Sequence, residues 1–223
     1  MEENKKDGSF DLKSQKRRLK RIIFGVFLMF FVLLCICIFI LNLPQPKTAG
    51  TDYTDALTDY SFYPVVYENI FEDPDYTEQM RRVNYADVSE GIREYVISED
   101  NINDFDASVV FMYNYIQYII NGETEKFNAC FSNAYYEKVY PKEQFTMQRL
   151  YDINLYRVDV QNENGYPVYI FKLDYKILKN NGSFRRDISS ETSRTKTIYV
   201  TAREGRLAID GEVILHIEHN EKK

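Results

Sequence analysis

The stretch YIFKLDYKI at residues 169–177 decides the type of fold, because apolar and charged side chains alternate along it. Successive side chains of a strand point to opposite faces of a sheet, so this pattern predicts a strand with one buried face. Upstream, the stretch ASVVFMYNYIQYII at residues 107–120 repeats its apolar residues at helical intervals. It predicts a helix that Asp106 caps and that Asn121-Gly122 ends.

Weaker patterns extend outward from these two stretches. Strands are expected at residues 153–160, 195–201 and 206–215, with glycine-containing turns at 162–165, 180–183 and 203–205. Helices are expected at residues 123–131 and 133–139, from Pro141 to about residue 150, and once or twice between residues 76 and 98. The sequence therefore predicts an α+β domain in which helices pack against an antiparallel sheet.

A long apolar segment precedes this domain. Residues 22–41 contain no charged side chain, and a helix of about 20 residues matches a hydrocarbon core of about 30 Å. We expect one transmembrane helix there. The alternative, a cleavable signal peptide, has a shorter apolar core, and Thr48-Ala49-Gly50 is a weak cleavage site. Neither Cys35 nor Cys37 follows the small residue of a lipoprotein signal, so both thiols are expected in lipid.

Charge divides unevenly around this segment. Residues 1–21 carry eight basic and four acidic residues, so the rest of the chain has 20 of the 28 basic and 30 of the 34 acidic residues. The positive-inside rule then predicts a cytoplasmic N-terminus and an extracytoplasmic C-terminal domain in the cell membrane. The basic tail faces the anionic lipid bilayer. The acidic domain is a poor partner for nucleic acid.

Four regions follow from these patterns. Residues 1–21 form a cytoplasmic basic tail, 22–41 the transmembrane helix, 42–74 a stalk rich in proline and polar residues, and 75–223 the extracytoplasmic α+β domain. Cys130 is the only cysteine beyond the predicted membrane helix, so no disulfide within this domain is expected. The domain must be stabilised by its apolar core.

The order of elements resembles the nuclear transport factor 2-like superfamily. The resemblance covers about residues 104–215: a helix, Asn121-Gly122-Glu123, a short helix with Phe127 and Phe131, and strands that end in GRLAIDG at 205–211. It implies a curved sheet wrapped around helices in a cone. Leu207 or Ala208 stands where many members carry an aromatic residue. The layout is also similar to the inner-membrane scaffold proteins of type IV secretion and conjugation systems.

Enzymes of that superfamily use a carboxylate or histidine with tyrosine inside the cone, so the resemblance makes such residues candidates for a catalytic site. Asp174 and Tyr175 are adjacent on a strand and must point to opposite faces. Asp159 and Asp210 would face inward only in one register, and we expect both to be solvated.

Other candidates for chemistry are weaker. His216, Glu218 and His219 could bind zinc, but the end of a chain offers little second-shell support. Cys130 has apolar neighbours and is expected to be a small core residue. The last candidate is a calcium-binding loop formed by Glu99, Asp100, Asp104 and Asp106. The segment lacks the glycine and the glutamate that such a loop requires.

Asn181-Gly182-Ser183 matches a glycosylation sequon, but Asn-Gly is also a common hairpin turn, which we favour. No catalytic residue, metal or cofactor is therefore expected. The sequence favours a non-catalytic, membrane-anchored binding or assembly module, as in a secretion or conjugation apparatus, with envelope proteins or further copies of itself as partners. The alternative is a ligand-binding or sensory domain with an apolar pocket.

Overall fold

The computed structural model describes residues 23–24, 26–29, 31, 60–89, 91 and 93–214. The chain divides into two compact units, residues 1–46 and 47–223. The described residues of the first unit are helical, and no helix within the described part of the chain is long and apolar enough to cross a membrane. Residues 1–22 and 32–59, and with them Cys35 and Cys37, lie outside the described residues, as do His216 and His219.

The second unit is built on one six-stranded mixed sheet with the strand order β2-β1-β3-β4-β5-β6. β1 pairs with β3 in parallel, and every other neighbouring pair is antiparallel. The α+β class is confirmed, but the expectation of a purely antiparallel sheet is wrong. The strands are β1 (Val83–Asp87), β2 (Arg93–Ile97), β3 (Leu150–Glu163), β4 (Tyr166–Ile177), β5 (Lys196–Thr201) and β6 (Ala208–Ile214).

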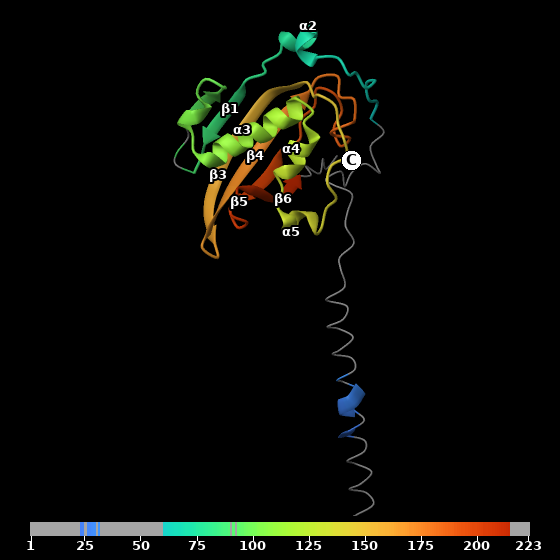
Figure 1. Ribbon diagram of the computed structural model, residues 1–223, viewed down its shortest axis with the longest axis vertical. Helices are drawn as coiled ribbons and strands as arrows, with labels where there is room; N and C mark the ends of the chain where they lie inside the picture. The colour runs from blue at the N-terminus through green and yellow to red at the C-terminus, as the bar shows by residue number, and fades with distance from the viewer. Residues whose placement is uncertain are drawn as a thin grey trace, which may run out of the picture. The chain divides into compact units, whose positions relative to one another are not determined.

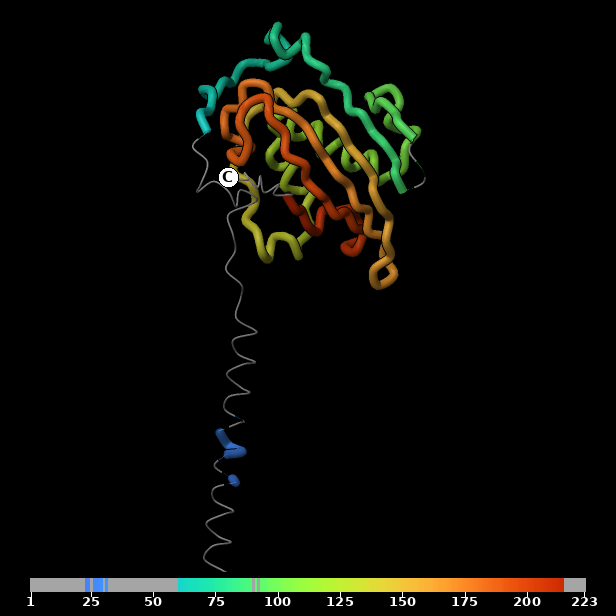
Figure 2. Tube along the Cα trace, turned by 180° about the vertical axis from the view of Figure 1, so that it is seen from behind, coloured from blue at the N-terminus to red at the C-terminus, as the bar shows by residue number. Residues whose placement is uncertain are grey.

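Helices cover one face of this sheet. In Figure 1, α3 (Ala107–Ile120) crosses β3 and β4, with α4 (Thr124–Ala129) beside it and α5 (Asn133–Tyr136) lower down, near β6. The view from behind shows the strands in front of these helices (Figure 2). The remaining helical elements are short: η1 (Ile70–Glu72), α2 (Pro74–Thr77) and η2 (Ile102–Asp104).

The predicted central helix is confirmed. Asp106 caps α3 by accepting hydrogen bonds from the backbone N–H of Ser108 at 2.8 Å and of Val109 at 3.4 Å. Met112 and Ile116 are fully buried, and Tyr115 is buried as well, so α3 packs on more than one side. On the sheet, Phe171 and the next alternate residues of β4 are buried as the alternation predicts.

Of the one or two helices expected between residues 76 and 98, only the end of α2 is present among the described residues, and residues 83–87 and 93–97 are strands. The spacing of Val88, Tyr95 and Val96 also fits a helix, but β1 and β2 pair as an antiparallel hairpin in this segment. Periodicity cannot separate helix from strand over segments this short, and the strands contain aromatic and β-branched residues that suit a sheet. Parallel pairing of β1 with β3 then requires a long crossover, which the three main helices supply.

The helical turn expected after Pro141 is also absent, because side chains from other elements bind this backbone. Asn128 of α4 donates to the carbonyl of Lys142 at 2.9 Å and accepts from its N–H at 2.9 Å. The hydroxyl of Thr124 accepts from the N–H of Phe145 at 3.1 Å. These contacts hold an irregular segment whose Phe145 side chain is buried.

The Asn181-Gly182 pair does not form a two-residue hairpin. It lies within the long connection between β4 and β5, residues 178–195. Gly182 has φ +71°, and a Cβ there would lie 2.9 Å from the Phe62 ring. A turn is present, as expected, but the segment around Phe62 packs against it and the connection folds back as a longer loop.

Candidate binding site at the β2 edge of the sheet

β2 is an edge strand of the described sheet, and its outer side is accessible. Arg93, Glu94, Tyr95 and Val96 are exposed, the last two at 43% and 42%. The side-chain amide of Asn101 donates to the carbonyl of Val96 at 2.8 Å, so this carbonyl turns away from β1. The backbone groups of successive residues in a strand point alternately to its two sides. Glu94 lies two residues before Val96, so its N–H and carbonyl also point away from β1. Such groups are a template for pairing with another chain.

A hollow of about 320 Å³ lies on the α3 side of this edge. Tyr85 and Tyr95 are directly opposed on β1 and β2, with ring centroids 6.3 Å apart. Phe105 stands almost perpendicular to both rings, at 5.7 Å and 5.5 Å. The remaining lining residues are polar: Asp87, Arg93, Asn101, Asp104, Asp106 and Arg157.

A second hollow, of about 400 Å³, lies on the opposite face of the same strands. Alternate residues of three adjacent strands line it, as expected for side chains that share one face of a sheet. They include Ala86 of β1, Glu94 and Val96 of β2, and Asn154 and Tyr156 of β3. The β2 edge therefore has a hollow on each face.

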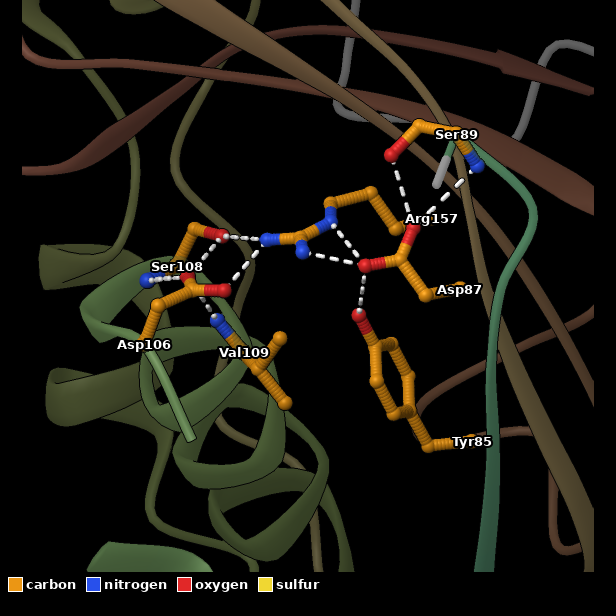
Figure 3. A network of polar contacts seen from close by, with 7 residues as sticks. All are labelled: Tyr85, Asp87, Ser89, Asp106, Ser108, Val109 and Arg157. Atoms are coloured by element: carbon orange, nitrogen blue, oxygen red, sulfur yellow. Dashed lines mark hydrogen bonds and ion pairs between the residues drawn. The ribbon is translucent and has the colours of Figure 1, made fainter. Parts of the chain in front are cut away.

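An ion-pair cluster centred on Arg157 of β3 forms the wall of the first hollow (Figure 3). Arg157 Nη2 and Nε donate to Asp87 Oδ2 of β1, and Nη1 donates to Asp106 Oδ2 at the start of α3. The Tyr85 hydroxyl donates to Asp87 Oδ2 at 3.3 Å. The Ser89 hydroxyl donates to Asp87 Oδ1 at 2.7 Å. This cluster joins two strands to the central helix.

Both carboxylates of the cluster are held in the ionised form. Burial by itself raises the pKa of Asp87, but hydrogen bonds from Arg157 and Ser89 outweigh it and leave that pKa below the ordinary 3.8. The pKa of Asp106 is lowered in the same way, by Ser108 and Arg157 against burial. Burial raises the pKa of Tyr85 well above its ordinary value. Ionised, fully engaged carboxylates and a neutral phenol suit binding better than proton transfer.

A second polar cluster lies in the interior, beneath α3. The hydroxyl of Tyr115 donates to Glu212 Oε1 of β6 at 2.9 Å, and Lys196 Nζ of β5 lies 3.6 Å from Glu212 Oε2. Arg185 and Asp187 form a further pair, each only 1% exposed. None of the described hollows is lined by these residues. They stabilise the interior rather than form an open site.

The carboxylates considered from the sequence have structural roles. Asp159 is exposed at a bulge of β3 and accepts from the N–H of Val160 at 2.8 Å. Asp210 accepts from the hydroxyl of Ser132 at 2.6 Å, which ties β6 to the start of α5. Asp174 and Tyr175 occupy opposite faces as predicted: Tyr175 is buried, and Asp174 is half-buried.

The structure also places the candidate calcium ligands and the candidate glycosylation site. All four acidic residues are exposed, but only Asp104 and Asp106 line the hollow beside α3, and Glu99 and Asp100 do not. Among the residues that the structure describes, no group of three or more His, Cys, Asp or Glu side chains is placed to hold a metal. Asn181 is half-buried, and its amide donates to the Thr146 hydroxyl at 2.8 Å, so this sequon is engaged within the fold.

Cys130 is buried in the core, as expected. Its thiol donates to the carbonyl of Lys126 at 3.3 Å, and burial raises its pKa to about 12. Because the thiolate is the reactive form, we predict slow labelling by maleimide in the native protein at pH 7.5 and fast labelling in denaturant. Mass spectrometry of the Cys130 peptide measures both rates. Rapid native labelling would show that this helix face opens.

Sequence reasoning did not identify the β2 edge. Arg157 has no special sequence context, and its two carboxylate partners lie far from it along the chain. The one residue of this site that the sequence indicates is Asp106, as a helix cap. A capping carboxylate has a second oxygen that can accept from another side chain. Tyr85 and Tyr95 lie in the segment for which the sequence predicts helices rather than strands.

Three comparisons relate this chain to known proteins. No family model matches the sequence, and neither the curated proteins nor the solved structures contain a significant match.

Proposed function

We propose that this chain is a non-catalytic, membrane-anchored binding and assembly module, and that its C-terminal domain contacts another protein through the β2 edge. The observation that carries the proposal is the edge itself. Glu94 turns backbone groups outward, exposed Tyr95 and Val96 flank it, and a hollow lies on each face. An added strand would gain backbone hydrogen bonds from the edge and side-chain selectivity from the hollows.

The anchor and topology belong to the same proposal. Residues 22–41 are proposed to cross the membrane, which places the acidic domain outside the cytoplasm beside other envelope proteins or further copies of the chain. The mixed sheet with helices on one face is compatible with a nuclear transport factor 2-like cone. Two register irregularities in the β3–β4 pair support a bent sheet. A role in a secretion or conjugation apparatus rests on the similarity of layout.

Cross-linking from the sheet edge tests this proposal. We expect full-length Glu94→Cys in native membranes, treated with a membrane-impermeant thiol-to-amine cross-linker, to form a discrete protein adduct. The engineered thiol is exposed beside outward backbone groups, so a partner strand would bring amines within reach. Immunoblotting detects the adduct, and mass spectrometry identifies the linked peptide.

Glu125→Cys provides the matched control, because Glu125 is an exposed glutamate on α4, away from both hollows. The proposal requires an adduct at residue 94 and none of the same mass at residue 125. Equal adducts at both positions would indicate random collision, and no adduct at residue 94 would exclude this edge as the contact.

A small-molecule-binding role is the second candidate, because hollows of about 320 and 400 Å³ fall within the size range of ligand sites. The hollow beside α3 combines three aromatic rings with charged groups, which could orient a ligand. A small molecule retained by the purified full-length protein, together with no adduct from Glu94→Cys, would favour this role.

A further inference from the structure

We infer that the strand recognised at the β2 edge inserts a lysine or arginine side chain into the hollow beside α3. This inference rests on the proposed function and specifies the partner. It follows from the charge, the aromatic rings and the strand geometry of that hollow.

The charged groups of the hollow leave an excess of negative charge. Asp87 and Asp106 share the single guanidinium of Arg157. Asp104 adds a third carboxylate and Arg93 a second cation. Three carboxylates against two cations give a net charge of −1 at neutral pH. Asp104 is exposed, so its carboxylate can turn toward an incoming cation.

The aromatic rings provide a second source of cation selectivity. Tyr85 and Tyr95 are inclined by only 24°, and Phe105 meets them at 90° and 86°. Rings in two nearly perpendicular orientations border the same space. A cation that lies over the face of one of these rings is favoured over a neutral or negative group, because the face of an aromatic ring is electron-rich.

Strand geometry determines which partner residues reach this hollow. A strand added beside Glu94 presents alternate side chains to the two faces. When the central residue of that strand lies opposite Tyr95, its side chain shares the face of Tyr95 and enters the hollow beside α3, whereas its two neighbours, opposite Glu94 and Val96, share the other face. The expected partner segment is therefore extended, with a basic residue between β-branched residues that suit a strand.

Three peptides of the sequence STVXVTS test this inference, with X as lysine, norleucine or glutamate. Binding is measured by fluorescence anisotropy to the full-length protein in lipid nanodiscs. We expect the lysine peptide to bind most tightly and the glutamate peptide most weakly. The difference between lysine and norleucine should shrink as salt is raised, because exposed charges are screened.

Two matched variants test whether the preference for lysine arises in the hollow beside α3. Asp104→Asn should weaken the lysine peptide about threefold to fivefold, the size expected for an exposed ion pair, and leave the norleucine peptide unchanged. Asp100→Asn is the control, since Asp100 is exposed in the same connection but does not line the hollow. It should change neither affinity.

The outcomes separate this inference from the proposed function. If the glutamate peptide binds as tightly as the lysine peptide, or if Asp104→Asn has no effect, the cation inference is wrong. An adduct at Glu94→Cys would still support the edge as a contact in that case. If no peptide binds, the inference also fails. Absence of the adduct as well would overturn the edge as a binding surface.

Discussion

Replacement of Arg157 by methionine is expected to lower the free energy of unfolding by about 3–5 kcal/mol, because it leaves Asp87 buried without its cation. Asp87 is 6% exposed and accepts from both Nε and Nη2 of Arg157. Asp106 loses the same partner but is more exposed, so its share of the loss is smaller. Urea unfolding followed by circular dichroism measures the change.

Two further variants distinguish lost charge from lost packing. Arg157→Lys keeps the charge but cannot engage both carboxylates in the same way, so an intermediate loss is expected. Arg157→Met combined with Asp87→Asn removes the unpaired charge and should recover part of the stability. If the double variant is no more stable than Arg157→Met, the loss arises from packing rather than from the stranded carboxylate.

The same cluster predicts a dependence on pH. The folded-state pKa of Asp87 and of Asp106 lies below the ordinary 3.8, so their contribution is present above that pH and is lost as pH falls through the folded value. Unfolding free energy of the native protein should fall below about pH 4. In Arg157→Met this acid-side slope should be flatter, because the lowered pKa depends on the guanidinium.

A second large effect is expected in the interior, where Lys196→Met should cost about 3–5 kcal/mol by stranding the buried carboxylate of Glu212. Lys196 is 4% exposed, and its Nζ lies 3.6 Å from Glu212 Oε2. Glu212 would retain the hydrogen bond from the Tyr115 hydroxyl, which cannot neutralise it. Thermal and urea unfolding of the purified full-length protein provide the measurement.

Adding Glu212→Gln to Lys196→Met should restore much of this stability. Glutamine can still accept the hydrogen bond from the Tyr115 hydroxyl and carries no charge, so the cost of a buried, unpaired carboxylate is removed. Glu212→Gln alone leaves the lysine without its carboxylate and should also be destabilising. Additive losses in the double variant would mean that the two residues are not energetically coupled.

These two clusters explain why sequence reasoning identified the scaffold better than the site. Apolar periodicity is local, so α3 and the buried face of β4 could be predicted from a dozen neighbouring residues. Arg157 and Lys196 carry no such signal. Their partners are far away in the chain, and only the pairing of β1 with β3 and of β5 with β6 brings them together.

The sequence did not predict the short strands β1 and β2, for a related reason. Helix and strand periods fit Tyr85, Tyr95 and Val96 almost equally well, and the choice depends on whether a partner strand is available. β3 provides that partner through parallel pairing across a long crossover. Local propensity contains no information about such a pairing.

The sequence by itself determined the α+β class, the capped central helix, the core positions of β4 and the burial of Cys130, because each depends on local periodicity or apolar context. Tertiary structure alone decided the mixed strand order, the accessible β2 edge and the sharing of Arg157 by Asp87 and Asp106. Hydrogen bonds between distant strands and the cost of leaving buried charge unpaired act only once the chain is folded.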